Sequence, residues 1–293
     1  MKVTITGSLG NISKPLAKRL VSAGHEVTII SSSTNKQADI EALGATAAIG
    51  SVGDTAFLTG AFTGADAVYT MIPPNVVAPD FRAYARATGQ NYAAAIQAAG
   101  VKRVVNLSSI GAHLAQGTGP IKGLHDVEHI LDALDGISLT HLRAGFFYLN
   151  LLGNIDMVKH AGIIGSNYNG DTVLRMVHPG DIAAVAAEEL QATGAGSHIR
   201  YVVSDERTAA DVAGVLGKAI GKSELPWVAF TDEQALDGML GAGLPQEMSS
   251  LYVEMGQAAG NGKLWEDYIL QQRILSPTKL EDFAVEFALA YNS

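Results

Sequence analysis

A glycine turn near the start of the chain has the residue types and the spacing to bind a phosphate group. Gly7 and Gly10 lie between a short β-branched strand at residues 3–6 and an amphipathic helix. The first backbone N–H groups of a helix have no partner within it, and the helix dipole adds positive charge there, so this turn can hold a pyrophosphate. The residues expected to contact it are Gly7, Ser8, Leu9, Gly10, Asn11 and Ile12.

The spacing of this turn, Gly-x-x-Gly-x-x-Ser, departs from the Gly-x-Gly-x-x-Gly fingerprint of dinucleotide sites. Ser13 stands where a third glycine usually allows the helix to pack closely on the strand. A plain connection between a strand and a helix is the alternative interpretation. We favour the nucleotide site because the turn follows a strand and opens a helix, which is the context that such a motif requires.

The elements that must position this turn alternate regularly through the first half of the chain. Expected strands are separated by helical segments, several of which end at a glycine such as Gly24, Gly64 or Gly100. Strands joined in this way imply right-handed crossovers and an α/β fold with a Rossmann-type, doubly wound parallel sheet. The expected strands span residues 3–6, 27–30, 46–49, 67–72, 104–107 and 137–142.

The second half of the chain predicts a smaller, mostly helical lobe. We expect a loop at residues 162–170, a strand at 199–203, a helix at 208–220 and a strand at 228–230. Residues 1–150 are expected to form the sheet domain. Residues 151–293 are expected to form mostly the smaller lobe, with segments near 172–203 returning to the sheet domain.

Composition and charge exclude several classes of function. The net charge of −9 disfavours nucleic acid or an anionic membrane as the main partner. The chain has no cysteine, which excludes disulfides and thiolate chemistry. No apolar run approaches the roughly 20 residues of a membrane-spanning helix, and the first residues form a strand rather than a secretion signal. We therefore expect a cytoplasmic protein without a membrane partner; a homodimer stays open.

Several strings of the sequence, taken in order, resemble one protein family. They are Gly64–Tyr69 (GADAVY), residues 104–112 (VVNLSSIGA), residues 140–147 (THLRAGFF) and residues 177–183 (VHPGDIA), together with the glycine turn. In this order and spacing they resemble the NmrA-like family of atypical short-chain dehydrogenase/reductases, from residue 1 to about residue 220. The resemblance implies a Rossmann domain that binds NAD(P), usually NADP(H). Members of this family include quinone reductases, reductases of plant phenolics and non-catalytic redox sensors, so the resemblance implies relatives of all three kinds.

The end of the second strand bears on the choice between NADP and NAD. A carboxylate there would bind the ribose 2′-hydroxyl, whereas a cation would pair with a 2′-phosphate. The chain has no carboxylate at this point, and the hydroxyls of Ser31, Ser32 and Ser33 with Lys36 can hold a phosphate. The NmrA-like pattern usually has an Arg near Ser31, which this chain lacks. We expect NADP as the cofactor, with NAD as the alternative.

Ligands of doubly wound sheets bind beyond the carboxyl ends of the strands, which marks further site residues. Met71, Ile72 and Pro73 are expected to contact the cofactor, and Ser108 and Phe146 to line its nicotinamide pocket. Aromatic rings in this region can exclude water from a flat acceptor, although ordinary core packing is the alternative. The residues expected at the acceptor are Asn75, Phe147, Tyr148 and Asn150.

Short-chain dehydrogenases transfer protons with a Tyr-x-x-x-Lys pair, and this chain departs from that pattern. If Glu128 marks the position that follows the pair in extended members, Leu124 takes the place of the Lys and Pro120 that of the Tyr. The nearest polar substitutes are Lys122 and His125, which we take as candidate catalytic residues. The alternative is that both are solvated polar residues at the start of a helix.

The spacing of His125 and His129, with Glu128 between them, also permits a metal site on one helix face. The sequence shows no third ligand at a useful spacing. A surface helix bearing charged side chains explains the pattern better, so we predict no metal.

The resemblance and the missing proton pair together lead to one expected function and one alternative. We expect an oxidoreductase that uses NADPH to reduce a small-molecule acceptor, a quinone or a related conjugated carbonyl, by hydride transfer. Quinone reduction can take its proton from water, so it needs the Tyr-x-x-x-Lys pair less than alcohol oxidation does. The alternative is a non-catalytic protein that senses the NAD(P) redox state.

Overall fold

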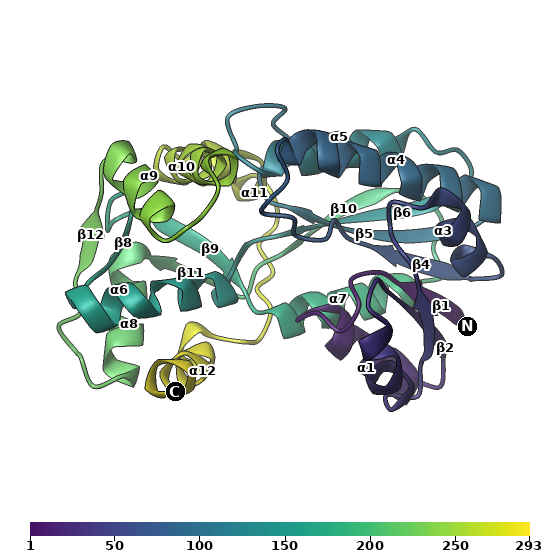
Figure 1. Cartoon of the computed structure of the whole chain (residues 1–293), viewed down its shortest axis with the longest axis horizontal. Helices are drawn as coiled ribbons and strands as arrows, with labels where there is room; N and C mark the ends of the chain where they lie inside the picture. Colours follow the sequence, from purple (N-terminus) through teal and green to yellow (C-terminus); the bar gives the residue numbers. More distant parts are fainter.

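A seven-stranded parallel sheet forms the centre of the larger lobe in this computed structural model, which describes residues 1–293 (Figure 1). Its strands are β1 (Lys2–Ile5), β2 (Glu26–Ser31), β3 (Thr46–Ile49), β4 (Ala67–Thr70), β5 (Arg103–Ser109), β6 (Ser138–Ala144) and β10 (His198–Val202). Their spatial order is β10-β6-β5-β4-β1-β2-β3. The order reverses between β1 and β4, as it does in the Rossmann fold, so the predicted fold class is confirmed.

Helices cover both faces of this sheet and bury separate apolar cores. α1 (Ser13–Ser22) and α7 (Pro179–Gln191) lie on one face, and α3 (Thr55–Phe62), α4 (Phe81–Ala99) and α5 (Ile121–Asp132) lie on the other (Figure 1). α2 (Gln37–Glu41) connects β2 to β3. Strand residues alternate between the faces: Val3 and Ile5 pack toward α1, whereas the Thr4 hydroxyl donates to the Ala61 carbonyl on α3.

Local capping signals explain where several of these elements begin and end. Asp54 accepts a hydrogen bond from the Phe57 N–H (3.0 Å), and Asp80 accepts one from the Ala83 N–H (2.8 Å), so α3 and α4 start one residue after each cap. β4 stops at Thr70, two residues before its predicted end, because the Met71 N–H bonds the Thr6 side chain instead. β6 extends to Ala144 because β5 and β10 pair with it on both sides.

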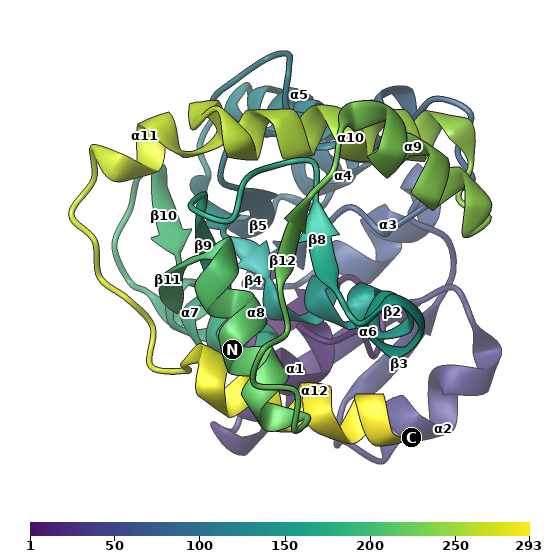
Figure 2. The same ribbon diagram turned by 90° about the vertical axis from the view of Figure 1, so that its left-hand side faces the viewer.

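The smaller lobe combines two short sheets with six helices (Figure 2). One sheet contains β7 (Phe146–Phe147), β9 (Val173–Val177) and β11 (Asp205–Thr208), and the other contains β8 (Ile164–Ser166) and β12 (Trp227–Ala229). The helices are α6 (Ile155–Ala161), α8 (Ala209–Ala219), α9 (Asp232–Gly241), α10 (Gln246–Gly260), α11 (Glu266–Ile269) and α12 (Leu280–Asn292). Between β9 and β11 the chain returns to the large sheet, where α7 packs on one face and β10 forms an edge strand.

The prediction of a loop over residues 162–170 is partly wrong, because β8 lies within it. β8 pairs in parallel with β12, and Ile164 is opposite Trp227. A three-residue strand has little local signal of its own, and its partner lies far away in the sequence. No helix of the structure combines the length and the hydropathy that a membrane span requires.

An ion pair between α4 and α5 should make the free energy of unfolding depend on pH in the acid range. The Arg82 guanidinium donates two hydrogen bonds to Asp126 (2.7 and 2.8 Å), which hold the pKa of that carboxyl below its usual range. A depressed pKa adds stability above the unfolded-state value of about 3.9, and this stability is lost as the pH falls through the folded-state value. We expect Asp126→Asn to lower the free energy of unfolding by about 1 kcal/mol at pH 7.

The measurement is urea unfolding of both proteins at a series of pH values. The difference between the wild type and Asp126→Asn should shrink as the pH falls below about 4. An equal difference at neutral and strongly acid pH would contradict the assignment.

Candidate functional site

The glycine turn connects β1 to α1 at the carboxyl edge of the sheet and has a backbone conformation suited to a tight bend. Gly7 has a φ of +88°, and Ser8 is the only non-glycine residue with a positive φ (54°). The Ser8 N–H donates to the Ile30 carbonyl (3.1 Å), and its hydroxyl donates to the Ser31 hydroxyl (2.9 Å). Backbone strain of this kind concentrates at ligand sites, and here it joins the turn to the end of β2.

Ser13 takes the space that a third glycine would leave open. Its hydroxyl donates to the Thr6 carbonyl (2.8 Å), and a Cβ added to Gly7 would lie 2.6 Å from that hydroxyl oxygen. A Cβ on Gly10 would lie 3.0 Å from the Gly7 carbonyl oxygen. The departure from the usual glycine fingerprint is therefore compatible with close packing, with Gly7 sterically required and Gly10 in a tight contact.

Several backbone donors at this turn have no partner within the chain. The N–H groups of Leu9, Asn11 and Ile12 make no intrachain hydrogen bond, and the residue at the N-cap, Ile12, supplies no side-chain cap. α1 is ten residues long, so its dipole adds positive charge at the same place. Unpaired donors of this kind fit the pyrophosphate of a dinucleotide, which accepts hydrogen bonds and carries negative charge.

The segment after β2 provides hydroxyls and one free cation beside the turn. Ser31 is buried, and its hydroxyl donates to the Ser33 carbonyl (3.3 Å) while accepting from Ser8. The short 3₁₀ helix η1 (Thr34–Lys36) follows, with Ser32 and Lys36 exposed. Lys36 is exposed and takes part in none of the ion pairs of the structure, so its ammonium group is available to a ligand.

The chain after β4 lies against the glycine turn. The Met71 side chain would be 3.2 Å from a Cβ on Gly7, which places it beside the turn as expected for a cofactor contact. Tyr92 and Tyr84 of α4 donate to the carbonyls of Met71 (2.8 Å) and Pro73 (3.1 Å). These two hydrogen bonds hold the loop in place, and the expected cofactor contacts of Met71, Ile72 and Pro73 stay predictions. Asn75 is half-buried further along the same loop.

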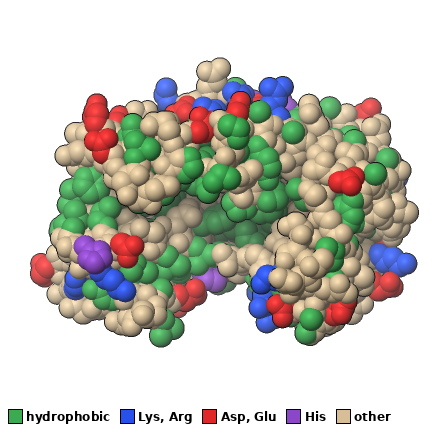
Figure 3. Space-filling view, in the orientation of Figure 1, with side chains coloured by type: hydrophobic (Ala, Val, Ile, Leu, Met, Phe, Trp, Pro, Cys, Tyr) green, Lys and Arg blue, Asp and Glu red, His purple; other side chains and the backbone are tan.

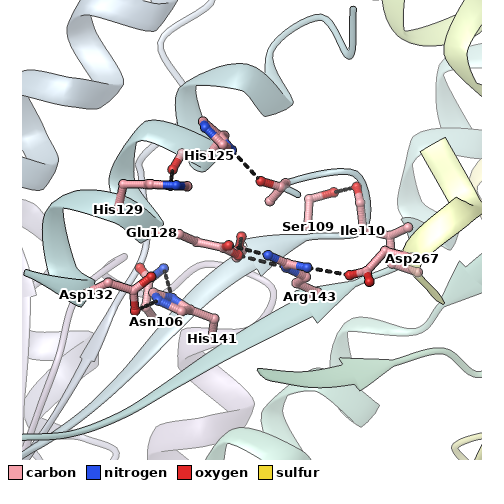
Figure 4. A network of polar contacts seen from close by, with 12 residues as sticks. Asn106, Ser109, Ile110, His125, Glu128, His129, Asp132, His141, Arg143 and Asp267 are labelled. Atoms are coloured by element: carbon pink, nitrogen blue, oxygen red, sulfur yellow. Dashed lines mark hydrogen bonds and ion pairs between the residues drawn. The ribbon is translucent and has the colours of Figure 1, made fainter. Parts of the chain in front are cut away.

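A buried polar network lies at the ends of β5 and β6 (Figure 4). The Ser108 hydroxyl donates to Glu128 (2.5 Å), and Arg143 donates to both oxygens of the same carboxylate (3.0 and 2.6 Å). Burial opposes the charge of Arg143, but its bonds to Glu128 outweigh that cost and raise the guanidinium pKa. The Ser108 hydroxyl gives its proton to Glu128, so only its lone pairs remain for another partner, and its place in the nicotinamide pocket stays a prediction.

The aromatic residues after β6 divide between the two lobes. Phe146 packs against the core of the smaller lobe and Phe147 against the core of the sheet domain, so the pair lies at the junction. Tyr148 is fully buried, stacks on Phe283 (ring centroids 5.3 Å apart) and donates to the Thr278 carbonyl. The expectation that Tyr148 faces an acceptor is therefore wrong, because the ring is core. Asn150 is exposed.

Both candidate proton donors on α5 already have partners. Lys122 pairs with Glu254 of α10 (3.0 Å). His125 contacts the Ala112 carbonyl through Nδ1 (2.8 Å), and its ring lies against His129 with centroids 4.1 Å apart. These contacts join α5 to its neighbours, and they favour a structural role over proton transfer. No set of three or more His, Asp or Glu side chains in the structure is placed to hold a metal ion.

With this geometry in view, comparison with known proteins points to NAD(P)H. Residues 7–144 match the protein family described as NAD(P)H-binding, and this range contains the glycine turn, the β2 end and the β4 loop. This match covers most of the large sheet domain and makes that part of the chain similar to the NAD(P)H-binding family. The structural neighbours below share the fold of this chain.

Two characterised relatives of this NAD(P)H-binding protein cover most of its length. It is 29% identical over 231 residues to a (4-alkanoyl-5-oxo-2,5-dihydrofuran-3-yl)methyl phosphate reductase of Streptomyces griseus, covering 76% of this chain and 77% of the relative. It is 26% identical over 254 residues to an NAD(P)H azoreductase of Xenophilus azovorans, covering 86% and 85%.

Solved structures of the same fold include complexes with the reduced or oxidised cofactor. The NADPH-dependent quinone oxidoreductase QOR2 of Escherichia coli, complexed with NADPH, superposes with a TM-score of 0.83 at 22% identity and covers 97% of this chain and 99% of its own. The triphenylmethane reductase of a Citrobacter species superposes with a TM-score of 0.82 at 20% identity and covers 99% of both chains. The fold of this NAD(P)H-binding protein is therefore shared along nearly its whole length.

One residue of the site region escaped the sequence analysis. His113 lies on the loop after β5, and both of its ring nitrogens are shielded from solvent without a hydrogen-bond partner. Burial lowers the pKa of His113, so the ring is neutral at pH 7. The available signal was its place directly after the family motif at residues 104–112, because the loop beyond a central strand belongs to the ligand edge of the sheet.

Lys36 tests the expected preference of this NAD(P)H-binding protein for NADP. We expect Lys36→Ala to weaken NADPH binding by about 5-fold, because a single exposed ion pair contributes roughly 1 kcal/mol. NADH lacks the 2′-phosphate, so its affinity should not change. Fluorescence titration of both dinucleotides measures the effect, with the exposed Lys218→Ala on α8 as the matched control. Equal weakening of NADPH and NADH would contradict the role.

Proposed function

We propose that this chain is an NADPH-dependent reductase of quinones or related conjugated carbonyl compounds. Its relatives and structural neighbours are named for reducing a quinone, an azo compound, a triphenylmethane dye and an alkanoyl-oxo-dihydrofuran phosphate. These names support a general NAD(P)H-dependent reductase, and they share conjugated, electron-poor acceptors. The quinone or conjugated carbonyl is the acceptor that best suits the residues of this site.

The observation that carries this proposal is the composition of α5 at the two proton-relay positions. Pro120 is the N-cap residue of α5, and Leu124 is a half-buried residue one turn further on. Neither side chain can hold a proton, and Lys122 and His125 are engaged elsewhere. A conjugated acceptor delocalises the negative charge that a hydride brings, so water can supply the proton that follows.

The chain's own groups would then bind the cofactor and shield the reaction from water. The unpaired N–H groups of the glycine turn bind the pyrophosphate, and Ser32 with Lys36 binds the 2′-phosphate. When bound, NADPH supplies a hydride from its nicotinamide ring. Figure 3 shows a hollow between the two lobes that is floored by hydrophobic side chains, and Phe146 and Phe147 lie at this junction. An apolar wall excludes water and favours a flat acceptor.

Steady-state oxidation of NADPH against a panel of acceptors tests the proposal. The panel holds menadione, an azo dye, a triphenylmethane dye, an unsaturated lactone and, as the negative control, an unconjugated ketone. We expect turnover with menadione and none with the unconjugated ketone. Turnover of the ketone would overturn the proposal, because it would require the missing proton relay. Tight NADPH binding without turnover of any acceptor would instead indicate a redox-sensing protein.

A further inference from the structure

The two lobes meet where α10 and α11 lie beside α5 and the loop that follows β5 (Figure 1). Close packing holds this junction: Gly119 has no room for a Cβ against the Leu251 carbonyl, and Gly111 has none against the Leu264 side chain. Lys122 and Glu254 add an ion pair whose side chains are 22% and 30% exposed. The α10–α11 segment therefore forms one wall of the hollow between the lobes.

One further contact across this junction is buried and charged. Arg143 of β6 donates to Asp267 of α11 through Nη1 (2.6 Å), while its Nε and Nη2 groups donate to Glu128 of α5 (Figure 4). The side chain of Arg143 is 7% exposed and that of Glu128 is 3% exposed, whereas Asp267 is 28% exposed. A single guanidinium thus joins a carboxylate of the sheet domain to a carboxylate of the smaller lobe.

The shape of the guanidinium explains which of its nitrogens binds which carboxylate. Its Nε–Nη2 edge matches the two oxygens of one carboxylate, which leaves Nη1 pointing to the opposite side. Glu128 is itself held by the Ser108 hydroxyl at the end of β5. The orientation of Arg143 is therefore set by β5 and α5, and Asp267 must come to the position that Arg143 offers. A lysine has one point charge and cannot span both carboxylates in this way.

Tyr201 of β10 completes the arrangement. Its hydroxyl donates to Asp267 and accepts from Arg143 Nη1 (3.2 Å). Burial, reinforced by the bond to Asp267, raises the pKa of Tyr201 to about 12, so the hydroxyl stays protonated and remains a donor. The Tyr201 ring also packs against Tyr268, the residue after Asp267, with centroids 5.6 Å apart. Both polar and aromatic contacts thus fix the same turn of α11.

We propose that Arg143, acting through Asp267, is a positioning residue that sets α11 over the carboxyl ends of β5 and β6. In this role it fixes the wall of the acceptor pocket without touching the cofactor or the reacting atoms. The proposal rests on the proposed function for its meaning in catalysis. Its physical content, that this contact holds α11 in place, is independent of turnover.

Asp267→Asn cuts the contact at the smaller lobe and leaves the Arg143–Glu128 pair intact. We expect amide hydrogen exchange in residues 263–275 to become about 10-fold faster, because local opening is set by the contacts that tie a segment down. We also expect the KM for menadione to rise roughly 5-fold or more, while NADPH binding, measured by fluorescence titration, changes less than 2-fold. The segment that moves forms the acceptor wall and does not contact the glycine turn.

Asp126→Asn is the matched control, because it removes an equivalent Arg–Asp contact that lies wholly within the sheet domain. It should leave exchange in residues 263–275 and the KM for menadione unchanged. Arg143→Lys should resemble Asp267→Asn, and Asp267→Glu should restore slow exchange in part, because it keeps the charge. Exchange at the wild-type rate in Asp267→Asn, or equal effects of Asp126→Asn, would overturn the proposal. If no acceptor is turned over, hydrogen exchange still decides the inference while the proposed function fails.

Discussion

Gly7→Ala is expected to weaken NADPH binding by at least about 10-fold, since one lost hydrogen bond to a charged phosphate costs roughly 1.5–3 kcal/mol. The added Cβ would lie 2.6 Å from the Ser13 hydroxyl oxygen and 3.2 Å from Met71, at a φ of +88° that side chains rarely adopt. The turn must open to accommodate it. Opening displaces the unpaired N–H groups of Leu9 and Asn11, which are the expected pyrophosphate donors.

Gly24→Ala separates this effect from the cost of the backbone conformation alone. Gly24 has a φ of +81° at the end of α1, but a Cβ there meets no atom within 4 Å. Both variants should lose about 1 kcal/mol of stability for the left-handed conformation, while Gly24→Ala should bind NADPH as the wild type does. Fluorescence titration and urea unfolding of the three proteins measure both effects. Equal loss of NADPH affinity in the two variants would argue against a cofactor role for Gly7.

Arg143→Met should produce the largest loss of stability, about 3–5 kcal/mol, because breaking a buried ion pair leaves its partner charged and unpaired. Glu128 would keep only the Ser108 hydroxyl as a hydrogen-bond donor, in a site where its side chain is 3% exposed. Asp267 would keep Tyr201. Urea unfolding with the free energy extrapolated to water measures the change.

Arg82→Met is the control for Arg143→Met. Arg82 makes the same two-pronged contact with a carboxylate, but its side chain is 31% exposed, so we expect a loss of about 1 kcal/mol. High salt should reduce the Arg82 effect and leave the Arg143 effect nearly unchanged, because salt screens exposed charges far more than buried ones. Similar losses for the two variants would show that the Arg143 network contributes no more to the free energy of unfolding than a surface ion pair does.

Features of the fold that neighbouring residues decide could be predicted from the sequence. The glycine turn is defined by residues that lie within seven positions of one another, and its donors follow from the start of a helix. Alternating strands and helices with short connections leave few topologies open, so the doubly wound sheet followed from the order of the elements.

Roles that depend on a partner far away in the sequence could not be predicted in this way. Tyr148 lies in the predicted region after β6, but Phe283 and Thr278 draw its ring into the core of the smaller lobe. Lys122 and His125 have the right chemistry for proton transfer, and only the fold shows that Glu254 and the Ala112 carbonyl already engage them. The strand β8 was not predicted for the same reason, because its partner strand β12 lies far away in the sequence.

By itself, then, the sequence determined the sheet and the turn that is the candidate nucleotide site, because turns and strand alternation are set by neighbouring residues. The tertiary structure alone decided which polar groups near that site are free and which are engaged. Ser108, Glu128, Arg143 and Asp267 come from four separate segments, and the energy of a buried charge depends on all of its neighbours at once. Such a network has no local spacing to read, and it exists only after β5, β6, α5 and α11 have packed together.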